Sequence, residues 1–373
     1  MIHFNKPSIT EIEEGFMREA ALGSICGDGP FTKRATSLFM EKTGLSCALL
    51  TTSCTHALEL SALLAGVGAG DEVILPSFTF SSTANAFILR GAKLRFCEID
   101  PSTMNADAAH MASLVNDRTK VLAPIDYAGV ACDIDAMNDI AKKHGLTIVQ
   151  DAAQAVGSRY KGRPVGADAD FACYSFHETK NYVMGEGGAI HIKDPKLYER
   201  AEILREKGTD RSRFWRGEVD KYSWHDLGSS FLPSDILAAM LLGQLTRFEE
   251  ILKKRMYAWD FFDDGLKDLE SAGKLRRPVI PQYAQHNAHL FYIILNSSRE
   301  RDELHDYLRE KGVGAVIHYV PLHSSSFGLA MGNKPEDLPL TEDRASRLLR
   351  LPLYPDLKEE ECSQIVNSVK GFF

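Results

Sequence analysis

A single lysine, Lys180, stands between a short apolar run and a cluster of glycines. The apolar run, residues 171–175, has the composition of a buried strand, and the glycines within 185–188 lead into a second apolar run. A lysine held just past the end of a strand can face a cleft, where its amine forms a Schiff base if its surroundings keep part of it neutral. Most lysines in such positions are solvated, so this stretch permits the chemistry without requiring it.

Three further features could serve the same chemistry. Ser53 and Cys54 lie in a hydroxyl-rich turn before a helix, where free amides suit a phosphate, although an ordinary helix cap has the same pattern. Asp151 ends an apolar run and could either cap a helix or keep a ring nitrogen protonated. Phe80 follows another strand and could stack on a flat ring or belong to the core. Together with a strand-end lysine, these features match what pyridoxal phosphate requires.

The composition is that of a soluble globular protein with more than one core. The chain has 373 residues, of which 44% are hydrophobic and 25% are charged. A net charge of -8 without a basic run argues against a nucleic-acid or anionic-membrane partner. The seven cysteines show no CxxC spacing, which fits reduced thiols. With no apolar signal core and no apolar run of membrane length, we expect a cytoplasmic protein.

Apolar runs alternate with helical patterns from residue 46 onward, which predicts an α/β fold. The runs of strand length are 47–50, 73–76, 94–97, 121–123 and 146–151. Between the last two, apolar residues recur at helical spacing, with Asp133 as a cap and Gly145 as the stop. Strands separated by helices predict a mostly parallel sheet, with ligands at the carboxyl ends of its strands.

Other segments flank this alternation. Two N-terminal helices, predicted at 8–22 and 32–43, precede any core strand, so we expect this arm on the surface or against a partner subunit. The arginine-rich and aromatic stretch 208–232 predicts an ordered functional loop. The elements predicted after it are a long helical region 233–269, strands at 289–296 and 314–318, and helices at 299–311, 341–349 and 358–370. We therefore expect a large domain over residues 1–250 and a smaller C-terminal α/β domain over 251–373.

Longer runs carry a family resemblance. They are residues 26–29, 76–87, 127–132, 151–154, 175–181, 205–209, 219–224, 228–230 and 318–323. Over essentially its whole length the chain resembles the DegT-type sugar aminotransferases, which are fold-type I pyridoxal-phosphate enzymes. The resemblance implies a large domain with a mostly parallel seven-stranded sheet flanked by helices. Within the family, the runs are most similar to the subgroup that makes TDP-4-amino-4,6-dideoxygalactose (TDP-fucosamine).

The resemblance also implies roles for individual residues. Lys180 matches the Schiff-base lysine, which also moves a proton, and Asp151 matches the partner of the ring nitrogen. The residues that match cofactor contacts are Ser53, Cys54, Phe80, Gln154, Ser175 and His177. The residues expected to bind the nucleotide sugar are Arg211, Arg213, Trp215, His318, Tyr319 and His323. The cofactor implied is pyridoxal 5'-phosphate, cycling through pyridoxamine 5'-phosphate.

Two positions depart from the family pattern. Many relatives donate an asparagine from the neighbouring subunit to the phosphate, and Leu232 stands at that position here. Ser229 and Ser230 are the candidates to replace it. Relatives also often carry a histidine shortly before the glycine of the 127–129 turn, where this chain has Asp126.

The implied reaction moves an amino group from L-glutamate to the C4 ketone of TDP-4-keto-6-deoxyglucose, in a homodimer with shared active sites. A C3 ketone, a UDP-linked sugar and either product configuration stay open. A sugar dehydratase on the same scaffold would lack the Schiff-base lysine, and a cofactor-binding regulator would not need the lysine–aspartate pair. We expect no metal, because His318 and His323 lack a third ligand at zinc spacing. The glycines at 185–188 do not form a dinucleotide fingerprint.

Overall fold

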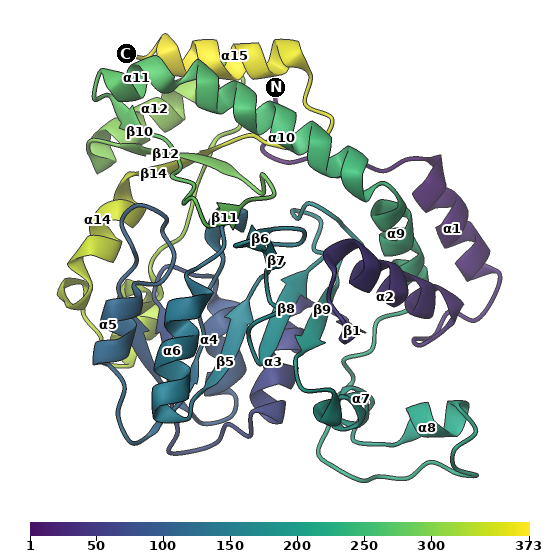
Figure 1. Ribbon diagram of the computed structural model, residues 1–373. Helices are drawn as coiled ribbons and strands as arrows, with labels where there is room; N and C mark the ends of the chain where they lie inside the picture. The colour runs from purple at the N-terminus through teal and green to yellow at the C-terminus, as the bar shows by residue number, and fades with distance from the viewer.

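The computed structural model describes residues 1–373, and its centre is a seven-stranded sheet (Figure 1). The strand order is β1-β9-β8-β5-β4-β2-β3, with β1 and β9 antiparallel to their neighbours and the other pairs parallel. The strands are β1 (Ala48–Thr51), β2 (Glu72–Pro76), β3 (Lys93–Cys97), β4 (Thr119–Leu122), β5 (Thr147–Asp151), β8 (Phe171–Ser175) and β9 (Gly188–Ile192). This confirms the predicted α/β fold and its mostly parallel sheet.

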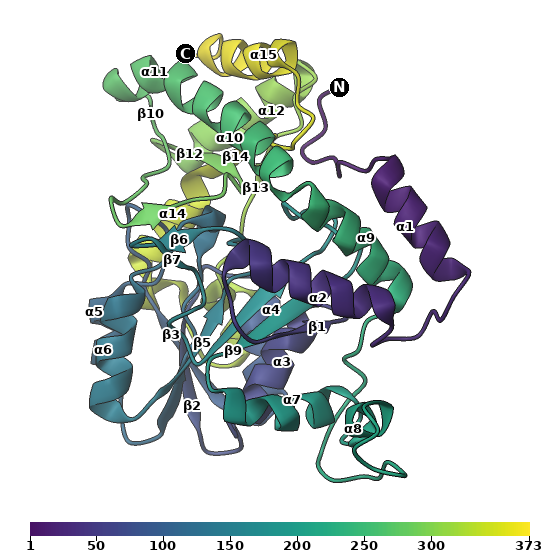
Figure 2. The same cartoon turned by 45° about the vertical axis from the view of Figure 1, so that its right-hand side comes forward.

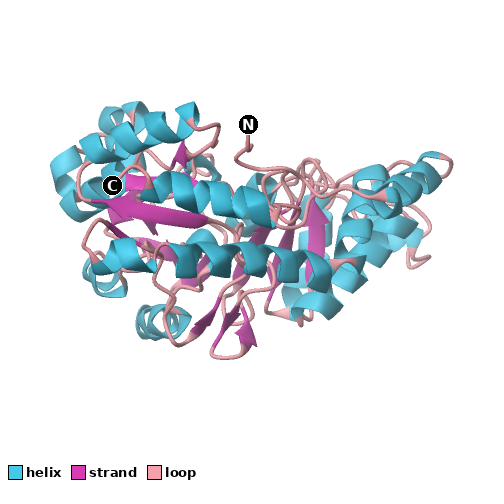
Figure 3. Ribbon diagram, turned by 90° about the horizontal axis from the view of Figure 1, so that it is seen from above, coloured by secondary structure: helices cyan, strands magenta, loops and turns pink.

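Both faces of this sheet are buried, because successive strand residues point to opposite sides. Ile148 and Ala172 join one core cluster, whereas Val149 and Phe171 join the other. Helices lie on both sides of the strands (Figure 3). They are α3 (Cys54–Leu64), α4 (Ser81–Ile88), α5 (Ala108–Ser113), α6 (Ile134–His144) and α7 (Tyr198–Arg205), together with the N-terminal helices and α9. Helix α6 has the predicted cap at Asp133 and the predicted stop at Gly145.

The N-terminal helices α1 (Glu11–Ala21) and α2 (Pro30–Thr43) pack against α9 (Asp235–Thr246), as Figure 2 shows. The buried carboxylate of Asp235 holds the start of α2, accepting hydrogen bonds from the amides of Phe31 and Thr32 at 3.1 and 2.7 Å. The aromatic side chain of Phe39 lies in the main core cluster. The expectation of a purely peripheral arm is therefore wrong for α2, which forms part of the core.

The C-terminal third forms its own sheet, in the order β10-β12-β14-β13, with a separate core cluster. Its strands are β10 (Leu275–Arg276), β12 (Phe291–Leu295), β13 (Val316–Ile317) and β14 (Leu348–Leu351). Its helices are α10 (Phe248–Gly265), α11 (Lys267–Ser271), α12 (Ser298–Glu310), α13 (Ser326–Ala330), α14 (Pro339–Arg347) and α15 (Glu359–Lys370). Residue 250, the predicted domain boundary, falls near the start of α10, and the division into two domains stays a prediction.

Three details complete the fold. A small sheet, β11-β6-β7, pairs Ala284–Gln285 with Arg159–Tyr160 and Arg163–Pro164 and so joins the two parts of the chain. The stretch 208–232 contains one short helix, α8 (Arg211–Trp215). None of the helices is both long enough and apolar enough to cross a membrane.

Two predicted helical segments differ from the structure. The region 233–269 is not continuous, because the chain leaves helical geometry at Arg247 and at Leu266. The helix predicted at 341–349 ends at Arg347, and Leu348 and Leu349 begin β14, where they pair with β12. Long-range strand pairing therefore overrides the helical pattern at that end.

Candidate active site

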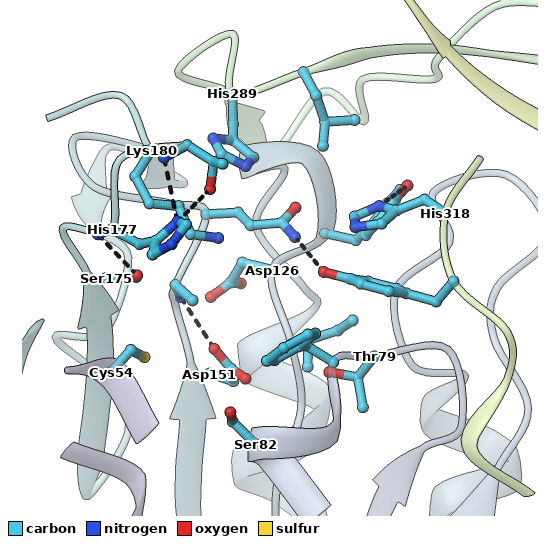
Figure 4. A pocket seen from close by; sticks show the side chains of 18 of the residues that line it. Cys54, Thr79, Ser82, Asp126, Asp151, Ser175, His177, Lys180, His289 and His318 are labelled. Carbon is cyan, nitrogen blue, oxygen red and sulfur yellow. Dashed lines mark hydrogen bonds between the residues drawn. The ribbon is translucent and has the colours of Figure 1, made fainter. Parts of the chain in front are cut away.

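A cavity of about 700 Å³ lies at the carboxyl ends of β5 and β8. Its wall includes ten of the residues predicted from the sequence, namely Ser53, Cys54, Phe80, Asp151, Gln154, Ser175, His177, Lys180, His318 and Tyr319. Figure 4 shows Cys54, Asp151, Ser175 and Lys180 arranged around this common space. The parallel sheet thus brings together residues that lie far apart in the sequence, at the edge where open α/β sheets bind ligands.

Lys180 lies in a tight loop that returns from β8 to β9. The backbone amide of Lys180 donates to the carbonyl of His177 at 2.9 Å, and the amide of Glu178 donates to the carbonyl of Gly185 at 3.0 Å. The next residue, Asn181, donates from its side chain to the carbonyl of Asn287 at 2.8 Å. Burial lowers the pKa of the Lys180 amine, although the neighbouring Cys54 and Asp151 act in the opposite direction. A fixed amine that loses its proton more readily suits Schiff-base chemistry.

Asp151 is the last residue of β5 and is 9% exposed. Burial raises the pKa of its carboxyl, while the Thr83 hydroxyl, the Ala153 amide and the charge of Lys180 lower it. The hydroxyl of Thr83 donates to one oxygen at 2.6 Å and the Ala153 amide to the other at 3.1 Å. Thr79 pairs with the Thr83 hydroxyl at 2.8 Å. These hydrogen bonds fix the orientation of the carboxylate, but no cationic side chain forms an ion pair with it.

The turn before α3 provides donors for an anion. Ser53 caps the helix, and its hydroxyl accepts from the His56 amide at 3.1 Å. The amides of Cys54 and Thr55 come at the start of the helix and have no carbonyl within it to bond. Gly188 lies so close that a Cβ there would stand 2.5 Å from the Cys54 nitrogen. β9 can approach the start of α3 this closely only because residue 188 has no side chain.

The remaining cofactor candidates line the same cavity. Phe80 precedes α4 and is 59% exposed. Gln154 accepts from the Ala128 amide at 2.7 Å and donates to the Tyr319 hydroxyl at 3.3 Å. The hydroxyl of Ser175 accepts from the His177 amide at 3.3 Å. A flat face, a buried carboxylate, a desolvated amine and a helix start together fit a flat, anionic cofactor that bears an aldehyde.

The structure brings only some of the predicted sugar contacts to this cavity. His318 and Tyr319 line it, and the His318 ring nitrogen Nδ1 lies 3.1 Å from the Tyr127 hydroxyl. His323 is 1% exposed and lies outside the cavity, where its Nδ1 lies 2.6 Å from the Ser77 hydroxyl. Within this chain His323 is thus placed as a packing residue, and its position offers nothing to support a sugar contact.

Four other candidates lie away from the cavity. Arg211, Arg213 and Trp215 belong to α8, which projects from the body of the molecule (Figure 1). Arg211 pairs with Glu206 at 3.1 Å and Arg213 with Glu199 at 3.3 Å. Ser229 is exposed and follows the same excursion of the chain. These residues could meet an active site only in a second subunit, so their assignment stays a prediction.

Several residues in or beside the cavity were given no role from the sequence. Thr83 belongs to a run that resembles the family, but nothing in its type marks it as the donor to Asp151. His289 lines the cavity and accepts or donates at Nδ1 with the Asn181 side chain at 2.9 Å. Arg350 lies in β14, whose first two residues were predicted as the end of a helix, and no strand was predicted there. Asp126 accepts from the Gln150 side chain at 2.9 Å, and burial raises its carboxyl pKa to about 7.

No three side chains among histidine, cysteine, aspartate and glutamate come together in a way that could hold a metal ion. The two histidines considered at the sequence level, His318 and His323, have the separate surroundings described above.

Comparisons with known proteins agree with this geometry. A model of the DegT/DnrJ/EryC1/StrS aminotransferase family matches residues 7–370. The aminotransferase TlmJ from Streptoalloteichus hindustanus is 32% identical with a TM-score of 0.91, covering 100% of this chain and 98% of its own. The candidate sugar aminotransferase Spr1654 from Streptococcus pneumoniae, solved in its pyridoxamine-phosphate form, is 27% identical with a TM-score of 0.93, covering 100% and 99%.

The spore coat polysaccharide biosynthesis protein SpsC of Bacillus subtilis is a relative whose name states a biological role. It is 31% identical over 351 residues, which cover 92% of this chain and 89% of SpsC. Spr1654 has been solved with pyridoxal phosphate as well. The family match over nearly the whole length shows that this chain belongs to the DegT/DnrJ/EryC1/StrS aminotransferase family and is a pyridoxal-phosphate-dependent sugar aminotransferase.

Proposed function

We propose that this enzyme transfers the amino group of L-glutamate to the C4 ketone of TDP-4-keto-6-deoxyglucose. The products are TDP-4-amino-4,6-dideoxygalactose and 2-oxoglutarate. The observation that carries the transfer chemistry is that Lys180 and Asp151 line one cavity, with the lysine pKa lowered by burial. The sugar class is supported by the name of SpsC, a polysaccharide biosynthesis protein, and the TDP-linked acceptor by the resemblance of runs such as 127–132 and 219–224.

Lys180 is proposed as both the covalent anchor of the cofactor and the proton carrier. Its neutral amine would take the proton from the substrate carbon, and the ammonium formed in that step would give the proton to the neighbouring carbon. The loop bonds at His177 and Gly185 keep the lysine backbone in place during both steps. The lowered pKa therefore serves catalysis directly.

Asp151 is proposed to hold a proton on the ring nitrogen of the cofactor. When bound, pyridoxal phosphate supplies an electron sink for the negative charge that develops at the substrate carbon. The carboxylate must stay ionised for this task, and the hydrogen bonds from Thr83 and Ala153 favour its ionised form. The protonated ring nitrogen of the cofactor would then be the cationic partner that Asp151 lacks within this chain.

The other residues are proposed to bind and orient. Phe80 would cover one face of the ring, and Gln154 would lie beside the phenolic oxygen. The phosphate would bind at Ser53, Cys54 and Ser175, with His177 as a positioning residue. On the acceptor side, His318 and Tyr319 would contact the sugar.

A homodimer is proposed to complete the site. In one chain, α8 and Ser229 lie away from the cavity, and Trp215 and Trp224 are 65% and 79% exposed. Large exposed aromatic side chains on a projecting segment favour contact with another subunit. Arg211, Arg213 and Trp215 would then face the diphosphate and base of a nucleotide sugar in the neighbouring site. We place this enzyme in the cytoplasm, which accords with seven free cysteines.

The cofactor and the reaction can be tested in sequence. The purified protein should be yellow, and borohydride should bleach it irreversibly by reducing the Schiff base at Lys180. A panel of TDP- and UDP-linked 4-keto and 3-keto sugars should then release 2-oxoglutarate from L-glutamate, fastest with TDP-4-keto-6-deoxyglucose. The product configuration at C4 follows from its NMR coupling constants. Faster turnover of a C3 ketone or a UDP sugar would replace the proposed acceptor.

Two other activities have distinct outcomes in the same assays. A dehydratase would change the sugar without consuming glutamate, and the presence of Lys180 disfavours it. A regulator would bind the cofactor and show no turnover with any sugar.

A further inference from the structure

Arg350 is the one arginine that lines the cavity, and no acidic side chain pairs with it. Its Nη2 donates to the carbonyl of Ile317 at 3.2 Å, and its buried Nε has no partner. The other basic side chain at the cavity, Lys180, shares it with the carboxyl of Asp151, and the two groups interact electrostatically. An arginine that is mostly withdrawn from water and lacks a counter-ion is costly for the fold alone.

The fold aims this side chain at the cavity. Leu349 and Leu351 are fully buried in the C-terminal core, so strand alternation places Arg350 on the opposite face of β14. The guanidinium carbon lies 4.6 Å from the centre of the Phe4 ring, which supports it from the side of the N-terminal segment. The donor groups are therefore held in advance of any ligand.

We propose that Arg350 binds a carboxylate of the amino-acid donor. The planar guanidinium can donate two parallel hydrogen bonds to a carboxylate. Arg350 and Lys180 line the same cavity, so one small molecule could meet both. The phosphate of the cofactor has its own donors at the start of α3, which leaves Arg350 for a second anion.

This inference rests on the proposed function only in taking L-glutamate as the donor. It does not depend on which sugar accepts the amino group. The two half-reactions can be followed apart, because the donor converts the yellow form of the holoenzyme to the colourless amine form and a keto-sugar reverses this.

The test compares Arg350→Gln and Arg350→Lys with the wild-type holoenzyme and with Arg344→Gln as a matched control. Arg344 also has a buried Nε without a partner and a pKa lowered by burial, but it lies outside the cavity and pairs with Asp343 at 3.0 Å. In Arg350→Gln, the L-glutamate concentration for half-maximal bleaching should rise about 10- to 100-fold, the loss expected for a charge-assisted pair. Arg350→Lys should recover part of the affinity, and Arg344→Gln should behave like wild type.

The keto-sugar half-reaction shows whether the loss is specific to the donor. Its half-saturating sugar concentration should change less than about 3-fold in Arg350→Gln. Unchanged glutamate saturation would overturn the proposal, and so would a defect confined to the sugar half-reaction. A wild-type enzyme that glutamate does not bleach would overturn it as well. Failure of every keto-sugar with normal bleaching would instead remove the proposed acceptor and leave Arg350 in place.

A second donor identifies which carboxylate binds. L-Alanine carries only the α-carboxylate, so Arg350→Gln should weaken bleaching by both amino acids if that group binds Arg350. Weakening for L-glutamate alone would assign Arg350 to the distal carboxylate. Both results keep the proposal, whereas bleaching that is unchanged in the mutant with both amino acids rejects it.

Discussion

At the scale of single residues, the carboxyl of Asp151 is balanced between burial, which raises its pKa, and hydrogen bonds, which lower it. The strongest side-chain bond comes from Thr83, whose hydroxyl in turn pairs with Thr79. This chain of hydroxyls controls a charge that the proposed chemistry needs at neutral pH.

Thr83→Val should therefore move the acid side of the pH–rate profile upward. Without the hydroxyl the pKa of Asp151 rises further, so the ionised carboxylate is lost at a higher pH as the solution is acidified. We expect turnover at neutral pH to fall about 10-fold, since a hydrogen bond to a charged group contributes about 1.5–3 kcal/mol. Steady-state rates of the wild type and of Thr83→Val, measured from acidic to alkaline pH, show both the shift of the acid limb and the fall in turnover. An unshifted acid limb would show that Thr83 does not act through Asp151.

Lys180 should cost the cofactor-free protein stability. Burial lowers its pKa in the folded protein, so the cost of the buried charge is largest at low pH and fades as pH rises through the lowered pKa toward the unfolded value. Lys180→Met should raise the melting temperature of the cofactor-free protein by a few degrees near neutral pH, and by less under alkaline conditions. Lys196→Met, at an exposed position, serves as the control. A constant gain at all pH values would point to packing instead of charge.

At the scale of elements, the phosphate turn depends on how closely β9 approaches α3. Gly188→Ala would place a methyl group 2.5 Å from the Cys54 nitrogen. Because overpacking costs about 1–3 kcal/mol, we expect cofactor affinity to fall about 10- to 100-fold. Titration of the cofactor-free protein, followed by visible absorbance, measures the change. Gly68→Ala, which has nothing within 4 Å of its Cβ, should bind normally.

Strands that sit within regular alternation were predictable, and strands that depend on distant partners were not. The run 146–151 and the cap and stop of α6 follow from local patterns, and the structure has them where expected. Leu348 and Leu349 continue the helical spacing of the residues before them, and only their pairing with β12 makes them a strand. A local pattern carries no information about that partner.

The candidate site divides in the same way. Lys180 and Asp151 could be named as candidate site residues because the sequence shows both their residue types and their positions at the ends of apolar runs. Arg350 stands out because its buried Nε has no hydrogen-bond partner and no acidic side chain pairs with it, and only the three-dimensional structure shows this. His323 was named for its type and its closeness to Tyr319 in sequence, yet its ring is turned toward Ser77.

At the scale of the whole molecule, the proposed shared sites can be tested by mixing inactive subunits. Lys180→Ala removes the anchor from one site, and Trp215→Ala would damage the segment that reaches the neighbouring site. Random pairing makes half of the dimers mixed, and each mixed dimer keeps one intact site. We therefore expect recovery to about a quarter of wild-type activity. Sedimentation of each variant confirms that the dimer forms.

No recovery on mixing would mean that α8 serves its own chain or that subunits do not exchange. Mild denaturation and refolding of the mixture separates these causes, since it forces exchange. Continued inactivity after refolding would contradict the shared site.

The first residues of the chain act as a short tether between the C-terminal part of the chain and the loop that carries Lys180. Ile2 forms a bridge with Val313 beside the C-terminal sheet, and the Asn5 side chain donates to the carbonyl of Glu178 in the lysine loop at 3.0 Å. Three steps of extended chain reach roughly 10 Å. Any swing of the C-terminal sheet away from Lys180 is thereby limited to the slack in this tether, unless one of its two attachments opens first.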